Sequence, residues 1–135
     1  YKLFNDTYGH LAGDDCLKKI ADYLSKFNDP PFNFVSRYGG EEFSLLFLSR
    51  SKEEVIQLSE QIREDILNLK IPHETSPTHK YVTVSIGVAS VIPNEETSSQ
   101  KLILKADRAL YYSKNNGRNQ VTYFNEIQQK EMGLL

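Results

Sequence analysis

Two adjacent carboxylates beside a pair of glycines are the residues best suited to chemistry in this chain. They lie in the run Arg37-Tyr38-Gly39-Gly40-Glu41-Glu42-Phe43. A divalent cation such as Mg²⁺ binds one or two protein carboxylates and keeps water and substrate phosphate as its other ligands. Glycine lets a large ligand approach the backbone closely. Glu41 and Glu42 are therefore candidate metal ligands, and strand alternation would put them on opposite faces. The alternative for so short a run is a solvated hairpin tip.

The polar segment over residues 1–14 could bind the edge of a nucleotide base. The amide of Asn5 offers both a donor and an acceptor, and the carboxylate of Asp14 accepts hydrogen bonds from N–H groups. The alternative is an ordinary loop that leads into a helix, with Asp14 near the helix N-terminus, where negative charge is favoured.

Lys114 and Arg118 bracket the expected end of a helix and could bind a triphosphate. Arginine offers a planar fork of donors, whereas lysine is a point charge. The alternative is helix capping, because glycine and cations are common at helix C-termini in any case. His73 and His79 lie in a polar loop without the spacing of metal ligands, so we expect both to be exposed to solvent.

Length and composition place the chain among folded single domains. It has 135 residues, of which 39% are apolar and 25% charged, and a net charge of −2. These values exclude a disordered or collagen-like chain and, with no long apolar run, a membrane span. Without a strong basic excess, we expect no nucleic-acid partner and no membrane contact by this domain. The single cysteine, Cys16, cannot form an internal disulfide, which fits a reducing compartment.

The elements that must position these residues follow from hydrophobic spacing and turn signals. The spacing predicts helices over 14–27, 51–69 and 98–115, and strands over 34–38, 42–48, 82–91 and 121–124. Gly39-Gly40 is expected to form the tight turn of a β-hairpin. The order is that of a split βαββαβ unit without its first strand, and the sequence has no internal repeat.

Taken together, these segments resemble the GGDEF domain of diguanylate cyclases. The signature hairpin has the GGEEF form at residues 39–43. Residues 1–14 resemble the family's FK-x-x-ND-x-x-GH-x-x-GD run, with Tyr1 in place of the Phe. Residues 82–89 resemble a family strand, and 106–119 resemble its late helix and phosphate segment. All four occur in the family's order and spacing.

The resemblance implies a palm-like α+β fold, a relative of split βαββαβ, with helices packed on a central antiparallel sheet. It also implies condensation of two GTP into cyclic di-GMP with release of pyrophosphate, at the interface of two GGDEF subunits. Mg²⁺ would be the cofactor, and Mn²⁺ could replace it because both accept oxygen ligands.

The resemblance also assigns roles by position. Glu41 and Lys2 would be catalytic, and Glu41 and Glu42 would bind the metal. The substrate would be bound by Asn5, His10, Asp14, Gly39, Gly40, Lys114 and Arg118.

The family's first strand, with a metal-binding Asp, would precede Tyr1. We therefore expect a GGDEF domain over 1–124 and a tail or linker over 125–135, inactive by itself and part of a longer protein. That protein would carry an upstream sensor domain, with a downstream EAL domain as a further option. It would be cytoplasmic, or membrane-anchored through other domains. The alternative function is a catalytically silent GTP-binding regulatory module of a GGDEF–EAL protein.

Overall fold

The computed structural model describes residues 1–125, and the chain divides into two compact units. The first unit comprises Tyr1–Ser51 and Leu69–Val82, and the second comprises Lys52–Asn68 and the chain from Thr83 onward. The elements in chain order are α1 (Lys2–Tyr8), α2 (His10–Ser25), β1 (Asn33–Gly39), β2 (Glu42–Phe47), α3 (Lys52–Leu67), β3 (Ile86–Val88), α4 (Ser99–Asn115) and β4 (Val121–Tyr123).

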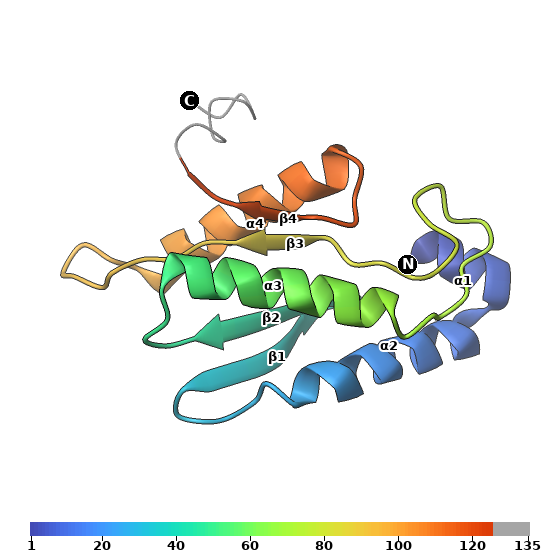
Figure 1. Cartoon of the computed structure of the whole chain (residues 1–135), viewed down its shortest axis with the longest axis horizontal. Helices are drawn as coiled ribbons and strands as arrows, with labels where there is room; N and C mark the ends of the chain where they lie inside the picture. The colour runs from blue at the N-terminus through green and yellow to red at the C-terminus, as the bar shows by residue number, and fades with distance from the viewer. Residues whose placement is uncertain (126–135) are drawn as a thin grey trace. The chain divides into compact units, whose positions relative to one another are not determined.

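The predicted β-hairpin is present in the first unit. β1 and β2 pair antiparallel, with Asn33 opposite Phe47 and Gly39 opposite Glu42 (Figure 1). Its turn lies one residue later than predicted, because Gly39 still pairs and Gly40 and Glu41 make the reversal. Gly40 has φ +54°, a left-handed conformation that glycine adopts without a steric cost.

Residues 2–8 and 10–14 are helical, which corrects the expectation of a loop. α1 ends before Gly9, whose φ of +89° is incompatible with a continuous helix. α2 begins directly after it, at His10. Asp14 therefore lies in the second turn of α2 and not at a helix start. The buried residues of α2 follow helical spacing: Gly13, Cys16, Leu17, Ile20 and Leu24.

His73 is buried, so the prediction of a solvated side chain was wrong for it. Its ring lies 5.3 Å from that of Phe4 and 6.5 Å from that of Tyr8, so the loop packs on α1. The hydroxyl of Tyr8 accepts a hydrogen bond from the backbone N–H of Glu74 at 2.8 Å. Burial lowers the pKa of His73 below its usual value, because the charged form is disfavoured away from water.

The second unit is built on a short parallel pair of strands. β3 pairs with β4 in parallel (Figure 1), whereas the sheet was expected to be antiparallel. The reason is that α4 connects the two strands, and a helical crossover returns the chain in the same direction. The strand predicted over 82–91 is also shorter, at Ile86–Val88.

β3 and α4 are in very close contact at Gly87. A Cβ at this position would overlap the backbone of Leu110 and Ala106. Beside it, the buried hydroxyl of Ser113 donates to the carbonyl of Ile86 at 3.0 Å and lies 2.7 Å from Thr122 Oγ1. The β3–α4 contact thus fixes the end of α4, where Lys114 follows.

The predicted helices of the second unit are confirmed with small shifts. α4 begins as expected, because the Ser98 hydroxyl caps it by accepting from the Lys101 N–H at 3.1 Å. α3 contacts both β3 and β4. The α+β class is therefore confirmed.

The predicted tail over 125–135 lies, from residue 126 on, outside the described residues. Within residues 1–125, no helix is both long and apolar enough to cross a membrane.

Candidate active site

The turn of the β1–β2 hairpin presents the two candidate metal ligands. Glu41 lies in the turn and is exposed, and Glu42 is the first residue of β2 and half-buried. The predicted alternation between strand faces therefore does not apply, because only Glu42 belongs to a strand. Arg37 Nε donates a hydrogen bond to the carbonyl of Gly40 at 2.7 Å and holds the turn from within β1.

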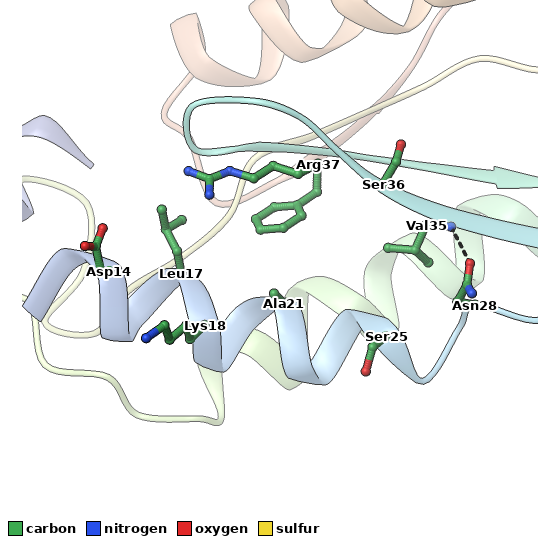
Figure 2. A pocket seen from close by; sticks show the side chains of 10 residues that line it. Asp14, Leu17, Lys18, Ala21, Ser25, Asn28, Val35, Ser36 and Arg37 are labelled. Atoms are coloured by element: carbon green, nitrogen blue, oxygen red, sulfur yellow. Dashed lines mark hydrogen bonds between the residues drawn. The ribbon is translucent and has the colours of Figure 1, made fainter. Parts of the chain in front are cut away.

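A cavity of about 590 Å³ lies beside the hairpin, between β1–β2 and α2 (Figure 2). This is within the usual range for small-molecule sites. It is lined by Asp14, Leu17, Lys18, Ala21, Ser25, Asn28, Val35, Ser36, Arg37 and Phe43. Arg37 therefore both holds the turn and lines the cavity.

The lining of this cavity combines apolar and charged side chains. Asp14 supplies an acceptor at one end of α2, and Leu17 and Phe43 supply apolar surface. Arg37 and Lys18 add positive charge for anionic groups.

Asn5, on α1, is half-buried and packs against Gly13 of α2. A Cβ at Gly13 would overlap the side-chain oxygen of Asn5. That oxygen, Oδ1, is buried and has no hydrogen-bond partner in the structure. A buried acceptor without a partner costs free energy, so its presence calls for an explanation. Asn5, Lys2 and His10 do not line the cavity, and the side chains of Lys2 and His10 are exposed.

The two basic candidates lie in the second unit, at the end of α4. Lys114 is half-buried in the last turn of the helix. Arg118 is exposed with φ +60°, and its backbone N–H donates to the carbonyl of Ser113 at 3.0 Å. Lys114 and Arg118 therefore flank a tight reversal that directly follows the helix.

Comparison with known proteins identifies the family. The family model described as "Diguanylate cyclase, GGDEF domain" matches residues 1–120. The chain is 38% identical over 126 residues to diguanylate cyclase DgcZ of Escherichia coli (strain K12), covering 93% of this chain and 41% of that protein. It is also 38% identical over 122 residues to diguanylate cyclase A of Treponema denticola, covering 90% of this chain and 32% of that one.

The chain belongs to the GGDEF family. Its fold is that of the family's palm-like α+β domain. The GGDEF domain of DgcB from Caulobacter crescentus, solved in complex with c-di-GMP, superposes with a TM-score of 0.78 at 35% identity. The match covers 90% of this chain and 70% of that one. The active GGEEF domain of a Vibrio cholerae diguanylate cyclase matches with a TM-score of 0.74 at 29% identity, covering 93% and 76%.

This GGDEF domain spans about two fifths or less of the curated relatives named here. The described residues contain no group of three or more His, Cys, Asp or Glu side chains that could hold a metal by themselves. Glu41 and Glu42 still fit Mg²⁺, because that ion takes one or two carboxylates and completes its shell with substrate phosphates and water.

Several residues that line the cavity of the GGDEF domain were not predicted to be site residues. Arg37 was noticed beside the hairpin but given no role, and Leu17, Lys18 and Phe43 were treated as ordinary helix or strand positions. The adjacency of Arg37 to the glycine pair was a usable signal. For the others, only the packing of β1–β2 against α2 reveals the common cavity.

Proposed function

We propose that this chain is the catalytic domain of a diguanylate cyclase, which condenses two GTP into cyclic di-GMP and two pyrophosphates. The observation that carries the proposal is the hairpin. An exposed carboxylate, Glu41, lies in the turn. Arg37 hydrogen-bonds to this turn and, together with Asp14, lines the neighbouring cavity. The family membership and the c-di-GMP complex of the C. crescentus relative support it.

The residues divide into those for the base and those for the phosphates. Asn5 and Asp14 hydrogen-bond the guanine edge, with His10 nearby, because an amide offers a donor and an acceptor and a carboxylate accepts from N–H groups. The remaining substrate contacts are assigned to Gly39, Gly40, Lys2, Lys114 and Arg118. The two glycines admit the nucleotide and the three cations bind phosphate oxygens.

The reaction is an in-line phosphoryl transfer carried out twice. The 3′-hydroxyl oxygen of one GTP forms a bond to the α-phosphorus of the other, and the bond from that phosphorus to pyrophosphate breaks. Glu41 accepts the proton of the attacking hydroxyl. Mg²⁺ or Mn²⁺, held by Glu41 and Glu42, supplies positive charge at the phosphate oxygens when bound.

Each domain binds one GTP, so the reaction requires a second GGDEF subunit in a homodimer. We propose that regions of the protein beyond this chain, a sensor domain among them, bring the subunits together and supply a further metal-binding carboxylate. A downstream EAL domain is a further option for a partner. Because the substrate is GTP, we also propose a cytoplasmic location.

The test is a cyclase assay on the full-length protein with GTP and Mg²⁺, with cyclic di-GMP measured by chromatography. We expect product from the wild type and a loss of about 100-fold or more in Glu41→Ala, the scale reported for removing one transition-state stabilising group. The matched control is Glu95→Ala, which removes an exposed carboxylate remote in sequence from the hairpin and should keep full activity. A folded dimer that binds GTP but makes no product would contradict the proposal and support the regulatory module instead.

A further inference from the structure

The turn that carries Arg118 is held in a conformation that its own residues disfavour. Gly117, Arg118 and Asn119 have φ values of +110°, +60° and +46°. Left-handed backbone is free for glycine but costs energy for other residues, although Asn tolerates it better than most. Such conformations persist only when the surrounding structure fixes them, and they are concentrated at functional sites.

Contacts within the turn account for part of this restraint. The side-chain amide of Gln120 donates to the carbonyl of Asn116 at 2.5 Å and to that of Arg118 at 3.2 Å. The N–H of Arg118 donates to the carbonyl of Ser113. All of these partners belong to α4 or to the turn, so they fix its shape but do not anchor it to another element.

Arg63 of α3 anchors the turn from a distant part of the chain. Its Nη1 donates to Oδ1 of Asn119 at 3.1 Å, across 56 positions of sequence. Both residues belong to the second unit. The contact reaches the side chain of Asn119, the third left-handed residue of the turn, directly after Arg118.

Arg63 is itself fixed in place. Its Nε and Nη2 each lie 3.0 Å from Oε2 of Glu60, and its Nη2 lies 3.7 Å from Glu64 Oε1. Its side chain is 18% exposed. A planar guanidinium held on one edge by carboxylates points its remaining N–H groups in a defined direction, here toward Asn119.

We propose that Arg63 is a positioning residue for nucleotide binding. By holding Asn119, it fixes the left-handed turn that aims the exposed side chain of Arg118 at the GTP phosphates. The proposal rests on the phosphate-binding role given above to Arg118. It adds α3, an element with no assigned site residue, to the set that determines GTP affinity.

The test is a double-mutant cycle on GTP affinity, measured by titration calorimetry of the full-length protein. Arg118→Ala should weaken binding about 10- to 100-fold, the scale of a charge-assisted hydrogen bond, and Arg63→Ala about 3- to 10-fold. If Arg63 acts through Arg118, adding Arg63→Ala to Arg118→Ala should cause no further loss. In turnover, Arg63→Ala should raise KM and leave kcat nearly unchanged.

Two further variants separate positioning from general stability. Asn119→Gly keeps access to the left-handed backbone and removes the Arg63 contact. It should therefore weaken GTP binding by the same factor as Arg63→Ala, and it replaces that variant as the test if Arg63→Ala folds poorly. Arg63→Lys should fail to restore affinity, because a lysine cannot hold Glu60 and Asn119 in one plane. Gln57→Ala, an exposed change on α3, is the control and should bind GTP as the wild type does.

The outcomes distinguish this proposal from the function on which it rests. The positioning role alone would be overturned if Arg63→Ala lowered GTP affinity equally in the wild type and in the Arg118→Ala variant. It would also be overturned if neither Arg63→Ala nor Asn119→Gly lowered GTP affinity. A wild-type protein that binds no GTP would overturn the proposed function and this inference with it.

Discussion

The two turns that carry the candidate residues differ in which residues adopt left-handed backbone conformations. The hairpin turn uses glycine at its left-handed position, and a Cβ on Gly40 would meet nothing within 4 Å. The turn after α4 places Arg118 and Asn119 in left-handed conformations and relies on Arg63 and Gln120 to keep them there. The side chain that holds the first turn, Arg37, comes from the same hairpin, whereas the second turn also depends on Arg63 of another element, α3.

This difference explains what each turn can supply. A glycine turn leaves an exposed carboxylate, Glu41, with open space around the backbone of the two glycines. A turn held by several side chains presents a cation in a defined direction, which suits phosphate recognition. Under the proposed function, we therefore expect the hairpin to supply the chemistry and the α4 turn to supply affinity for GTP.

The largest effect on stability is expected at the close contact between β3 and α4, which holds the end of the helix before the turn. Gly87→Ala should destabilise the protein by about 3 kcal/mol, because its Cβ would overlap the backbone of Leu110 and the helix cannot move aside without losing its contacts. Gly39→Ala should change stability by less than about 0.5 kcal/mol, since a Cβ there meets nothing within 4 Å. Urea unfolding gives the free energy of unfolding of both variants. Equal losses in the two variants would refute the expected difference between the Gly87 contact and the hairpin turn.

A smaller effect is expected at the hairpin turn itself. Gly40→Ala should cost about 1 to 2 kcal/mol through its positive φ and not through crowding. Gly40→Asn should cost less, because asparagine tolerates the left-handed region. Thermal unfolding compares the two, and an asparagine variant no more stable than the alanine variant would show that the turn is not limited by backbone conformation.

The smallest effect concerns pH and should be confined to the first unit. Since burial lowers the pKa of His73, the unfolded chain binds a proton below about pH 6.5 that the folded chain does not. Stability should therefore fall as the pH decreases from 7 toward 5. The amides of α1 should lose hydrogen-exchange protection before those of α4 and β4, where the buried Ser113 and Thr122 do not titrate.

His73→Phe keeps a ring against Phe4 and Tyr8 and should flatten this pH dependence. His10→Gln, a change at an exposed position, is the control and should leave it unchanged. A pH profile unaffected by His73→Phe would show that the buried ring is not the titrating group.

The same contrast governs what could be predicted from the sequence. The hairpin and the Ser98-capped α4 were predictable because their signals are local: a glycine pair between β-rich runs, and a serine before a helical spacing. The family followed from such local motifs as well, and the roles of Glu41 and Glu42 stay predictions from the same motifs.

Long-range packing decided the features that were missed. α1 looked like a polar loop, and it is helical where Phe4 packs on His73, nearly seventy positions away. The burial of His73, the clamp of Arg63 on Asn119 and the close contact at Gly87 depend on partners that no local pattern specifies.

The most direct test of the division between the two turns measures GTP binding and turnover in the same full-length variants. We predict that Glu41→Ala binds GTP within about tenfold of the wild type, yet loses cyclic di-GMP production by about 100-fold or more. Arg118→Ala should weaken GTP binding by about 10- to 100-fold and retain turnover at saturating GTP. Unchanged GTP affinity in Arg118→Ala, or full turnover in Glu41→Ala, would contradict the account.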